Sequence, residues 1–212
     1  CKLSDVTIEP SSRFGAMYVT AQGMDKTLAS ADKVLVVAIA RELLDAYEPE
    51  MATTYAAGMR AKLGLVEARD DDQPLVSGLL ELMRAGAVDY TNLFRDLAGV
   101  DSDSDLPVRT LRDRFVDREA FDAWLVTYRA RLRSERREPD ERRRAMNAVN
   151  PRYILRNYLA EQAIHAAEGG DYREIERLRL LLSRPFDEQA GMERYAAEPP
   201  DWGRELAVSC SS

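Results

Sequence analysis

The stretch "PRYILRNYLAEQAIHAAE" (Pro151–Glu168) decides the predicted fold, because its apolar residues recur at a spacing of three and four. Its apolar stripe consists of Leu155, Leu159, Ala163 and Ala166, and its charged residues lie off that stripe. This pattern predicts an amphipathic helix that packs by one side. Asn150 and Pro151 form a helix-start signal before the stretch, and two glycines follow it.

The same helical periodicity continues along most of the chain, in which Ala, Leu, Glu and Arg are abundant. Gly, Pro and capping residues set the expected ends. We predict helices from Ser30 or Asp32 to about Glu48, from Pro49 through Met59, from Asp72 to near Gly86, over residues 89–99, from Asp117 through Leu132, and from Asp171 to before Pro185. The sequence therefore predicts an all-α fold, a bundle of about seven or eight helices.

The two ends of the chain do not share this pattern. Residues 1–33 form a divergent or poorly ordered N-terminal segment, in which only Ala16–Ala21 shows a weak strand pattern. Residues 34–184 form the expected helical domain. Residues 185–212 form an irregular tail that ends in "VSCSS", so Cys210 lies two residues from the end of the given sequence.

Composition and net charge indicate a globular protein and exclude some binding functions. The 212 residues are 45% hydrophobic and 32% charged, which is typical of a soluble globular protein. The formal net charge of −7 disfavours binding to nucleic acid and to anionic membranes. No apolar run approaches the roughly 20 residues of a membrane-spanning helix. There is no signal-peptide pattern, and two cysteines do not make a disulfide scaffold, so we expect a cytoplasmic protein. The first residue is Cys, which suggests a piece of a longer polypeptide.

The acidic run "DSDSD" (Asp101–Asp105) resembles the start of a calcium-binding loop. An EF-hand loop requires Gly at its sixth position and Glu at its twelfth. Leu106 and Arg112 occupy those positions here. We therefore interpret the run as a solvated acidic loop.

An arginine cluster lies between Arg129 and Arg144, where eight arginines are mixed with four acidic residues. Such a cluster could bind phosphate or RNA. The interleaved acids, the absence of interleaved aromatic residues and the acidic chain favour a solvated, salt-bridged pair of helices instead.

No self-contained catalytic site is visible. His165 is the only histidine, which favours a structural or surface role and leaves no metal-ligand set. Trp124, Trp202, Tyr153 and Tyr158 are expected in the core. Neither GxGxxG nor GxxxxGK[ST] occurs in the sequence. We predict no catalytic, cofactor-binding or metal-binding residues.

Five stretches of this sequence are similar to stretches of one protein family, and they occur in the same order. They are "AGMRAKLGL" (57–65), "DYTNLFRDL" (89–97), "NPRYILRNYLAEQAIHAAEGGD" (150–171), "RPFDEQAGMERYAAEPPDWG" (184–203) and the ending "VSCSS". Together they resemble the C-terminal part of the selenoprotein O family and cover most of residues 34–212.

The resemblance implies a protein-kinase-like fold with a helical C-terminal extension, to which this chain would correspond. Members look like pseudokinases and act as protein adenylyltransferases, which transfer AMP from ATP, with Mg²⁺, to Ser, Thr or Tyr of other proteins. Their catalytic residues lie upstream of the stretches matched here. The resemblance thus implies that this chain lacks the nucleotide-binding lobe, is inactive alone, and binds no ATP or Mg²⁺ itself.

The resemblance also gives the terminal thiol a role. The third-last residue is selenocysteine or cysteine in the family, and Cys210 occupies that place. From the residues alone, an exposed cysteine without a role is the favoured interpretation of Cys210, although a mobile, accessible thiol can be oxidised or can exchange disulfides. "CKLSD" (Cys1–Asp5) retains a family pattern, which makes Cys1 the candidate redox partner of Cys210. The rest of residues 1–33 does not match.

Three hypotheses follow. The chain is the helical part of an adenylyltransferase, whose partners are the missing kinase-like lobe and the protein substrates, and it exposes apolar surface where that lobe docks. Alternatively, it is a stand-alone helical module that binds a protein partner in a groove without catalysis. A third hypothesis, RNA binding through the arginine cluster, conflicts with the net charge.

Overall fold

The computed structural model describes the backbone of residues 6–10, 17–21, 30–204 and 206, and the side chains of residues 38, 39, 41–204 and 206. The chain divides into two units, Cys1–Ala56 and Ala57–Ser212. Each unit is described by itself. Among the described residues the fold is helical, with ten helices and two short strands.

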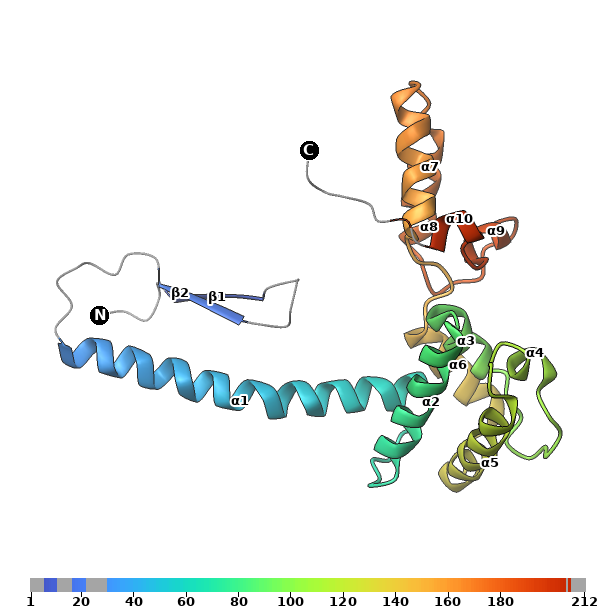
Figure 1. Ribbon diagram of the computed structural model, residues 1–212, viewed down its shortest axis with the longest axis horizontal. Helices are drawn as coiled ribbons and strands as arrows, with labels where there is room; N and C mark the ends of the chain where they lie inside the picture. The colour runs from blue at the N-terminus through green and yellow to red at the C-terminus, as the bar shows by residue number, and fades with distance from the viewer. Residues whose placement is uncertain (1–5, 11–16, 22–29, 205, 207–212) are drawn as a thin grey trace. The chain divides into compact units, whose positions relative to one another are not determined.

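The first unit contains a hairpin and most of a long helix (Figure 1). Strands β1 (Val6–Pro10) and β2 (Met17–Ala21) are antiparallel, with Ile8 opposite Val19. The sequence predicted irregular or poorly ordered chain in this region, and the hairpin differs from that prediction. Strand β2 lies within Ala16–Ala21, the stretch in which the sequence showed a weak strand pattern. Strand β1 ends in a proline, and its sequence showed no strand pattern.

Helix α1 (Ser30–Lys62) is continuous, whereas the sequence predicted two helices that meet at Pro49. A proline inside a helix removes one backbone hydrogen bond and costs about 3 kcal/mol. The helix nevertheless continues for thirteen residues after Pro49, to Lys62. Thr53 Oγ1 donates to the Pro49 carbonyl at 2.8 Å, next to the interrupted turn. The prediction of a helix boundary at Pro49 is therefore wrong.

The second unit begins with a first helix group, residues 57–149. After the end of α1 it contains α2 (Asp72–Gly86), α3 (Tyr90–Leu97), α4 (Arg109–Arg112), α5 (Arg118–Glu135) and α6 (Pro139–Val149). One hydrophobic cluster holds the group together, and its fully buried members include Leu79, Phe94, Phe121 and Met146. Asp117 caps α5, as predicted, by accepting from the Ala120 N–H at 2.9 Å.

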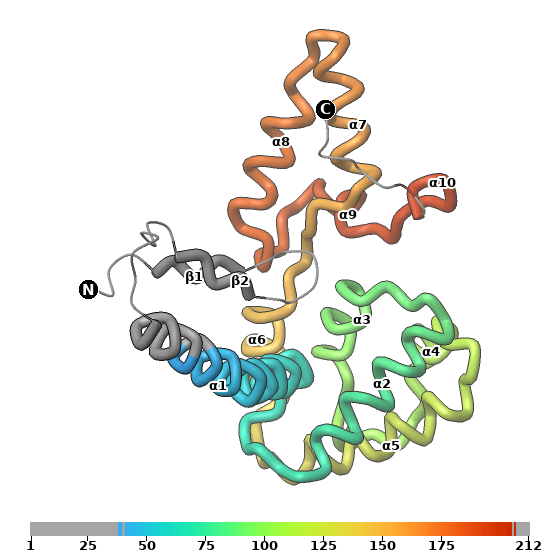
Figure 2. Tube along the Cα trace, turned by 60° about the vertical axis from the view of Figure 1, so that its left-hand side comes forward, coloured from blue at the N-terminus to red at the C-terminus, as the bar shows by residue number. Residues whose placement is uncertain are grey.

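A second helix group follows, consisting of α7 (Asn157–Glu168), α8 (Arg173–Leu182), α9 (Glu193–Ala196) and α10 (Asp201–Arg204). Helices α7 and α8 form a hairpin (Figure 2). A separate hydrophobic cluster holds the group together, with Tyr153, Leu159, Leu178 and Tyr195 among its members. Gly169 lies at the end of α7, as predicted.

Helix α7 begins at Asn157, six residues later than Asn150 and Pro151 predicted. The Asn150 side chain is used elsewhere, because its Nδ2 donates to the Lys62 carbonyl at 2.9 Å. The backbone N–H groups of residues 152 and 153 both donate to the Pro185 carbonyl, at 2.7 and 3.0 Å. These contacts hold the chain before α7 in a non-helical conformation. Leu155 therefore precedes the helix and is exposed, whereas Leu159 and Ala163 are buried as predicted.

The all-α fold class is confirmed. The expected number of helices is exceeded because α4, α9 and α10, of four residues each, carry too few residues for a periodic signal. In the described part of the chain, no helix has both the length and the apolar character that crossing a membrane requires.

Candidate functional site

The two cysteines that the sequence analysis singled out, Cys1 and Cys210, lie outside the described residues. The structure gives no geometry for either thiol.

The acidic run Asp101–Asp105 forms a loop whose polar groups bond within the protein. The Asp103 N–H donates to Asp101 Oδ1 at 2.9 Å, and Arg129 Nε donates to the Asp101 carbonyl at 3.0 Å. Within residues 41–204, no group of three or more His, Cys, Asp or Glu side chains is arranged to hold a metal ion.

The arginine cluster does not form a solvated surface throughout, and that part of the prediction is wrong. Arg129, Arg131 and Arg142 are buried. Arg142 donates through Nη2 to the Val100 carbonyl, and Arg131 donates to the Glu67 carbonyl at 2.6 Å. These guanidinium groups connect loops to helices, because a buried charge requires hydrogen-bond partners. The sequence pattern could not distinguish them from the exposed arginines of the cluster.

Arg131 lies at the centre of a buried ion-pair network. Its Nε donates to Asp72 Oδ1 at 2.8 Å and its Nη1 donates to Glu135 Oε1 at 2.6 Å. Burial lowers the pKa of the Arg131 guanidinium, but the hydrogen bonds that it donates to Asp72 and Glu135 more than offset that effect, so the pKa is raised. Two exposed members of the cluster also have partners, since Arg143 pairs with Asp140 at 2.6 Å and Arg133 donates to the Ser102 carbonyl at 2.6 Å. The buried arginines of the cluster are therefore committed to structural contacts.

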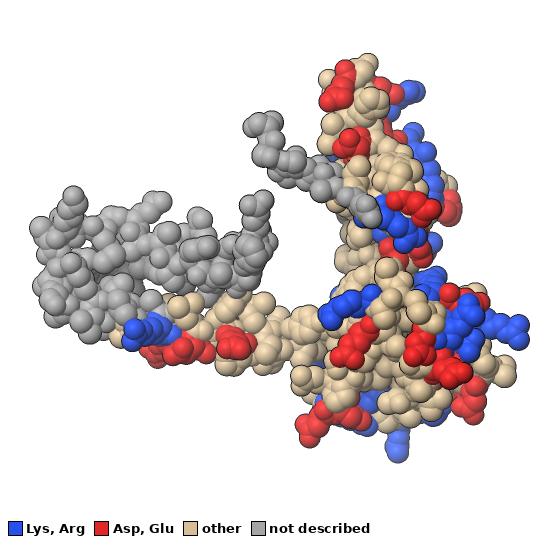
Figure 3. All heavy atoms as spheres, in the orientation of Figure 1, with Lys and Arg blue, Asp and Glu red and all other residues tan. Residues whose placement is uncertain are grey.

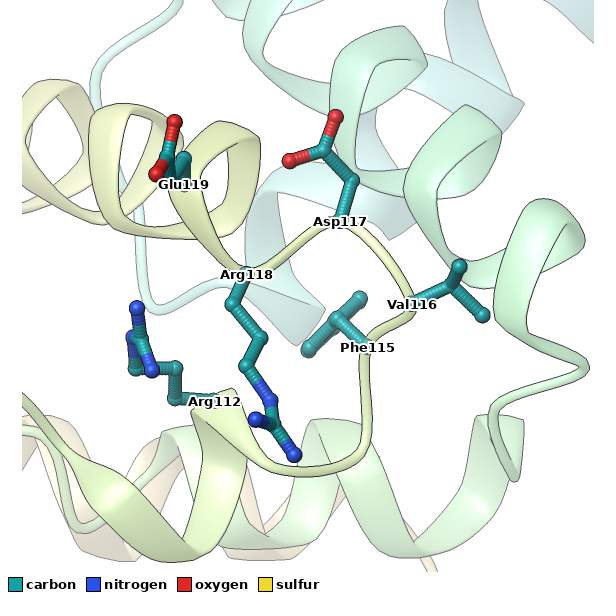
Figure 4. Close-up of a pocket in the computed structure, with 6 residues that line it drawn as sticks. All are labelled: Arg112, Phe115, Val116, Asp117, Arg118 and Glu119. Carbon is teal, nitrogen blue, oxygen red and sulfur yellow. The ribbon is translucent and has the colours of Figure 1, made fainter.

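An open depression of about 700 Å³ lies at the turn between α4 and α5. Arg112 and Arg118 project to one side of this turn and Asp117 to the other (Figure 4). Arg112 donates through Nε to Asp122 Oδ2 at 2.7 Å, which raises the pKa of the guanidinium. Arg118 lies 3.5 Å from Asp113. Since each cation has a carboxylate partner, the depression does not form an anion site.

Helix α3 carries buried polar contacts that the sequence analysis did not single out. Arg95 is buried and donates to four acceptors, which are the carbonyls of Asn147, Asn150 and Phe186 and the Glu188 carboxylate. No sequence pattern marks it, because its acceptors are far along the chain and three of them are backbone atoms.

Asp89, at the N-terminus of α3, forms a bidentate ion pair with Arg156, with N–O distances of 2.6 and 3.1 Å. It also caps α3 by accepting from the Asn92 N–H at 2.8 Å. Burial raises the pKa of the Asp89 carboxyl, but the hydrogen bonds from Arg156 and Asn92 outweigh it, so the pKa is lowered. The carboxylate is thus held in its charged form.

Of the aromatic and histidine side chains noted in the sequence, some are buried and others lie on the surface. Trp124, Tyr153 and Tyr158 are buried, as predicted. Trp202 is exposed and lies edge-on to the Tyr158 ring at 5.9 Å between centroids, so the core prediction is wrong for it. His165 lies on the surface of α7, where its side chain is 87% exposed.

The described part of α1 carries an apolar stripe. Leu44, Tyr47, Met51 and Tyr55 recur at spacings of three, four and four, which places them on one side of the helix. Leu44, Met51 and Tyr55 are exposed. Residues 51–59 contain no charge, and Figure 3 shows uncharged atoms over this stretch. We call these four residues the α1 stripe.

Comparison with known proteins identifies the family. The sequence profile described as "Protein adenylyltransferase SelO" matches residues 16–183, and so begins inside the segment expected to be divergent. The chain is 54% identical over 173 residues to the "Protein nucleotidyltransferase YdiU" of Pseudomonas fluorescens, which covers 81% of this chain and 35% of the relative. It is 53% identical over 185 residues to the protein of the same name from Thioalkalivibrio sulfidiphilus, covering 87% of this chain and 37% of that relative.

The relative of that name from Pectobacterium atrosepticum is 52% identical over 166 residues, which is 78% of this chain and 34% of the relative. The chain thus spans about a third of the length of the curated relatives it matches. The profile match and these identities show that the chain belongs to the protein adenylyltransferase SelO family.

Proposed function

We propose that this chain is the C-terminal helical part of a protein adenylyltransferase, a pseudokinase that transfers AMP from ATP to Ser, Thr or Tyr of other proteins. The whole protein would use ATP and Mg²⁺, and this chain alone would be inactive. The proposal rests on the family and on relatives whose printed name is protein nucleotidyltransferase. We also propose a cytoplasmic location.

The chemistry of AMP transfer indicates what the rest of the protein has to supply. The reaction requires cations against the phosphates, ligands for the metal ion and a positioned acceptor hydroxyl. Among the described residues, Arg112 and Arg131 are paired with acids and Arg142 with a carbonyl, and no group of three or more His, Cys, Asp or Glu side chains is arranged to hold a metal ion. We therefore assign no catalytic step to the described residues and propose that they support the catalytic part.

The observation that carries this supporting role is the α1 stripe. Tyr55 and Met51 are each about half exposed, with 57% and 48% of the residue surface accessible. At about 25 cal/mol per Å², covering a row of large apolar side chains is a substantial driving force for association. Large exposed apolar patches mark interaction sites. The portion of the relatives that lies outside the match, about two thirds of their length, is the occupant that we propose.

The stand-alone module remains the second candidate. It would use the same stripe to bind an unrelated helix, which is a common mode of recognition for apolar grooves and faces. The family membership favours the adenylyltransferase, because it supplies a partner within the same polypeptide.

The test is an AMP-transfer assay on a chimera. The segment of the Pseudomonas fluorescens relative that matches this chain is replaced by the corresponding residues of this chain, and AMP-modified Ser, Thr or Tyr is measured by mass spectrometry. We expect the chimera to transfer AMP, and we expect neither this chain alone nor the relative without the segment to do so. A folded chimera that transfers no AMP, or transfer by this chain alone, would overturn the proposal.

Cys210 and Cys1 are proposed as the redox pair of this protein. An accessible thiolate forms a disulfide through exchange with an oxidised thiol. Peptide mapping under non-reducing conditions should find a Cys1–Cys210 peptide after oxidation with oxidised glutathione. Finding each cysteine only as a glutathione adduct would refute the pairing while leaving the transferase proposal intact.

A further inference from the structure

The two helix groups of the second unit have separate hydrophobic cores. The first cluster draws on residues between Met59 and Met146, and the second on residues between Tyr153 and Ala196. The two clusters have no member in common. Each group therefore buries its own apolar stripe, which is the condition for a part of a protein to open as a unit.

The chain crosses between the groups at one peptide segment. Asn150 is held to the first group, because its side chain donates to the carbonyls of Lys62 and Phe94, at 2.9 and 3.4 Å. The N–H groups of Arg152 and Tyr153 are held to the second group, through the Pro185 carbonyl. Pro151, between these two attachments, is the pivot.

Arginine contacts on α3 join the groups beside this pivot. Arg95, from the first group, donates to the Phe186 carbonyl at 3.1 Å and to Glu188 Oε1 at 2.9 Å, both in the loop after α8. Arg156, from the second group, reaches Asp89 at the N-terminus of α3. We call these two sets of contacts the α3 latch.

The energetics of the latch differ from those of an apolar interface. Asp89 and Arg156 are nearly buried, with side chains 12% and 8% exposed. Two buried charges recover much of their hydration when they separate together, whereas removing one partner leaves the other buried and unpaired. Opening of the whole group therefore costs less free energy than removing one charge from the closed form. A single substitution in the pair shifts the equilibrium toward the open form.

The end of the chain moves with the second group. Asn157 Nδ2, in the first turn of α7, donates to the Leu206 carbonyl at 2.8 Å. A Cβ on Gly203 would lie 2.8 Å from Tyr158 Cβ, so α10 packs closely on α7. Whatever position the second group takes, the start of the C-terminal tail takes it too.

We propose that residues 152–206 open as one unit about Pro151, and that the α3 latch controls this opening. The latch holds the second helix group closed on α3, and its release lets α7–α10 and the start of the tail unfold together while the first core stays folded. This inference concerns the fold and does not depend on the proposed transferase activity.

The test is hydrogen–deuterium exchange of the full chain, read by mass spectrometry on peptides from α7 and α8 and from α2 and α5. The variant is Asp89→Asn, because Asn is also a good N-cap and leaves α3 capped while the charge pair is lost. The matched control is Glu176→Gln, which removes an exposed pair with Arg179 inside α8, at 2.6 Å. Glu188→Gln is a milder second variant, since that carboxylate is 70% exposed.

We expect Asp89→Asn to accelerate exchange in α7 and α8 by about tenfold or more over the Glu176→Gln control, with α2 and α5 unchanged. Glu188→Gln should give the same pattern with a smaller increase. Equal acceleration in both groups would show one cooperative unit and overturn the proposal. The proposal would also be overturned if neither Asp89→Asn nor Glu188→Gln exchanged faster in α7 and α8 than the Glu176→Gln control. If Asp89→Asn does not fold, the exchange rates of Glu188→Gln decide the test.

Discussion

Arg131 and Asp72, 59 residues apart in the sequence, form a buried ion pair between α5 and the first turn of α2, with 2.8 Å between Nε and Oδ1. Asp72 also accepts from the Arg69 N–H at 2.9 Å, so one carboxylate fixes a helix start and a helix-to-helix contact. The sequence predicted that Asp72 caps this helix, and that prediction is wrong, because the N-cap residue is Asp71 and Asp72 is the first residue of α2. The structure shows that its second oxygen is the partner of a buried arginine.

Removing this carboxylate should be strongly destabilising. Asp72→Ala leaves the Arg131 guanidinium buried with one fewer acceptor, and breaking such a pair costs about 3–5 kcal/mol. The control Asp140→Ala removes an exposed pair with Arg143 and should change the free energy of unfolding by less than about 1 kcal/mol. Urea denaturation of both variants measures the difference. Equal losses would contradict the structural role of Arg131.

Leu159 and Leu155 provide a matched pair on the stretch that decided the predicted fold. Leu159 is 4% exposed and Leu155 is 54% exposed. Leu159→Ala should lower the free energy of unfolding by about 2–5 kcal/mol, and Leu155→Ala by less than about 1 kcal/mol. If chemical denaturation showed equal losses, α7 would have to begin before Leu155.

Gly64 and Gly58 should respond to alanine with opposite signs. Gly64 has a φ of +75°, and an added Cβ would lie 2.7 Å from Met146 Sδ, so Gly64→Ala should destabilise by more than about 1 kcal/mol. Gly58 lies inside α1 with open space around it, so Gly58→Ala should stabilise by about 0.5–1 kcal/mol. Thermal unfolding of both variants checks the signs.

The Asp89–Arg156 pair should make stability depend on acid pH. The folded-state pKa of Asp89 lies below its ordinary value of 3.8, so its contribution is complete above about pH 5 and is lost as the pH falls through the folded pKa. The difference in unfolding free energy between the native chain and Asp89→Asn should therefore shrink from pH 5 toward pH 3. A difference that stayed constant or grew would indicate that Asp89 is not held in its charged form.

The sequence predicted the parts of the fold that depend on local periodicity and capping. The helix capped by Asp117 and the buried positions Leu159 and Ala163 were found as expected, because a buried apolar stripe recurs with the helical period. The start of α7 was misplaced because Asn150 bonds to Lys62, 88 residues earlier, rather than to the turn that follows it. Such long-range use of a capping residue leaves no local signal.

The candidate site was less predictable than the fold. Arg131 and the exposed arginines of the same cluster look alike in the sequence, because burial depends on which loop or helix packs against each of them. The α1 stripe was not predicted as such, because Pro49 was interpreted as a helix boundary and divided its four residues between two helices. Only a continuous helix places Leu44 and Tyr55 on one side.

We propose that the α1 stripe joins this chain to the catalytic part of an adenylyltransferase. The most direct measurement compares AMP transfer by the chimera, by its Tyr55→Glu variant and by its Ala56→Glu variant. Ala56 is also exposed but lies off the stripe, so it controls for the added charge. We predict that the chimera and Ala56→Glu transfer AMP, and that Tyr55→Glu loses about tenfold or more, because a charge resists burial. Equal activity of Tyr55→Glu and Ala56→Glu would contradict the stripe, and a folded but inactive chimera would contradict the transferase itself.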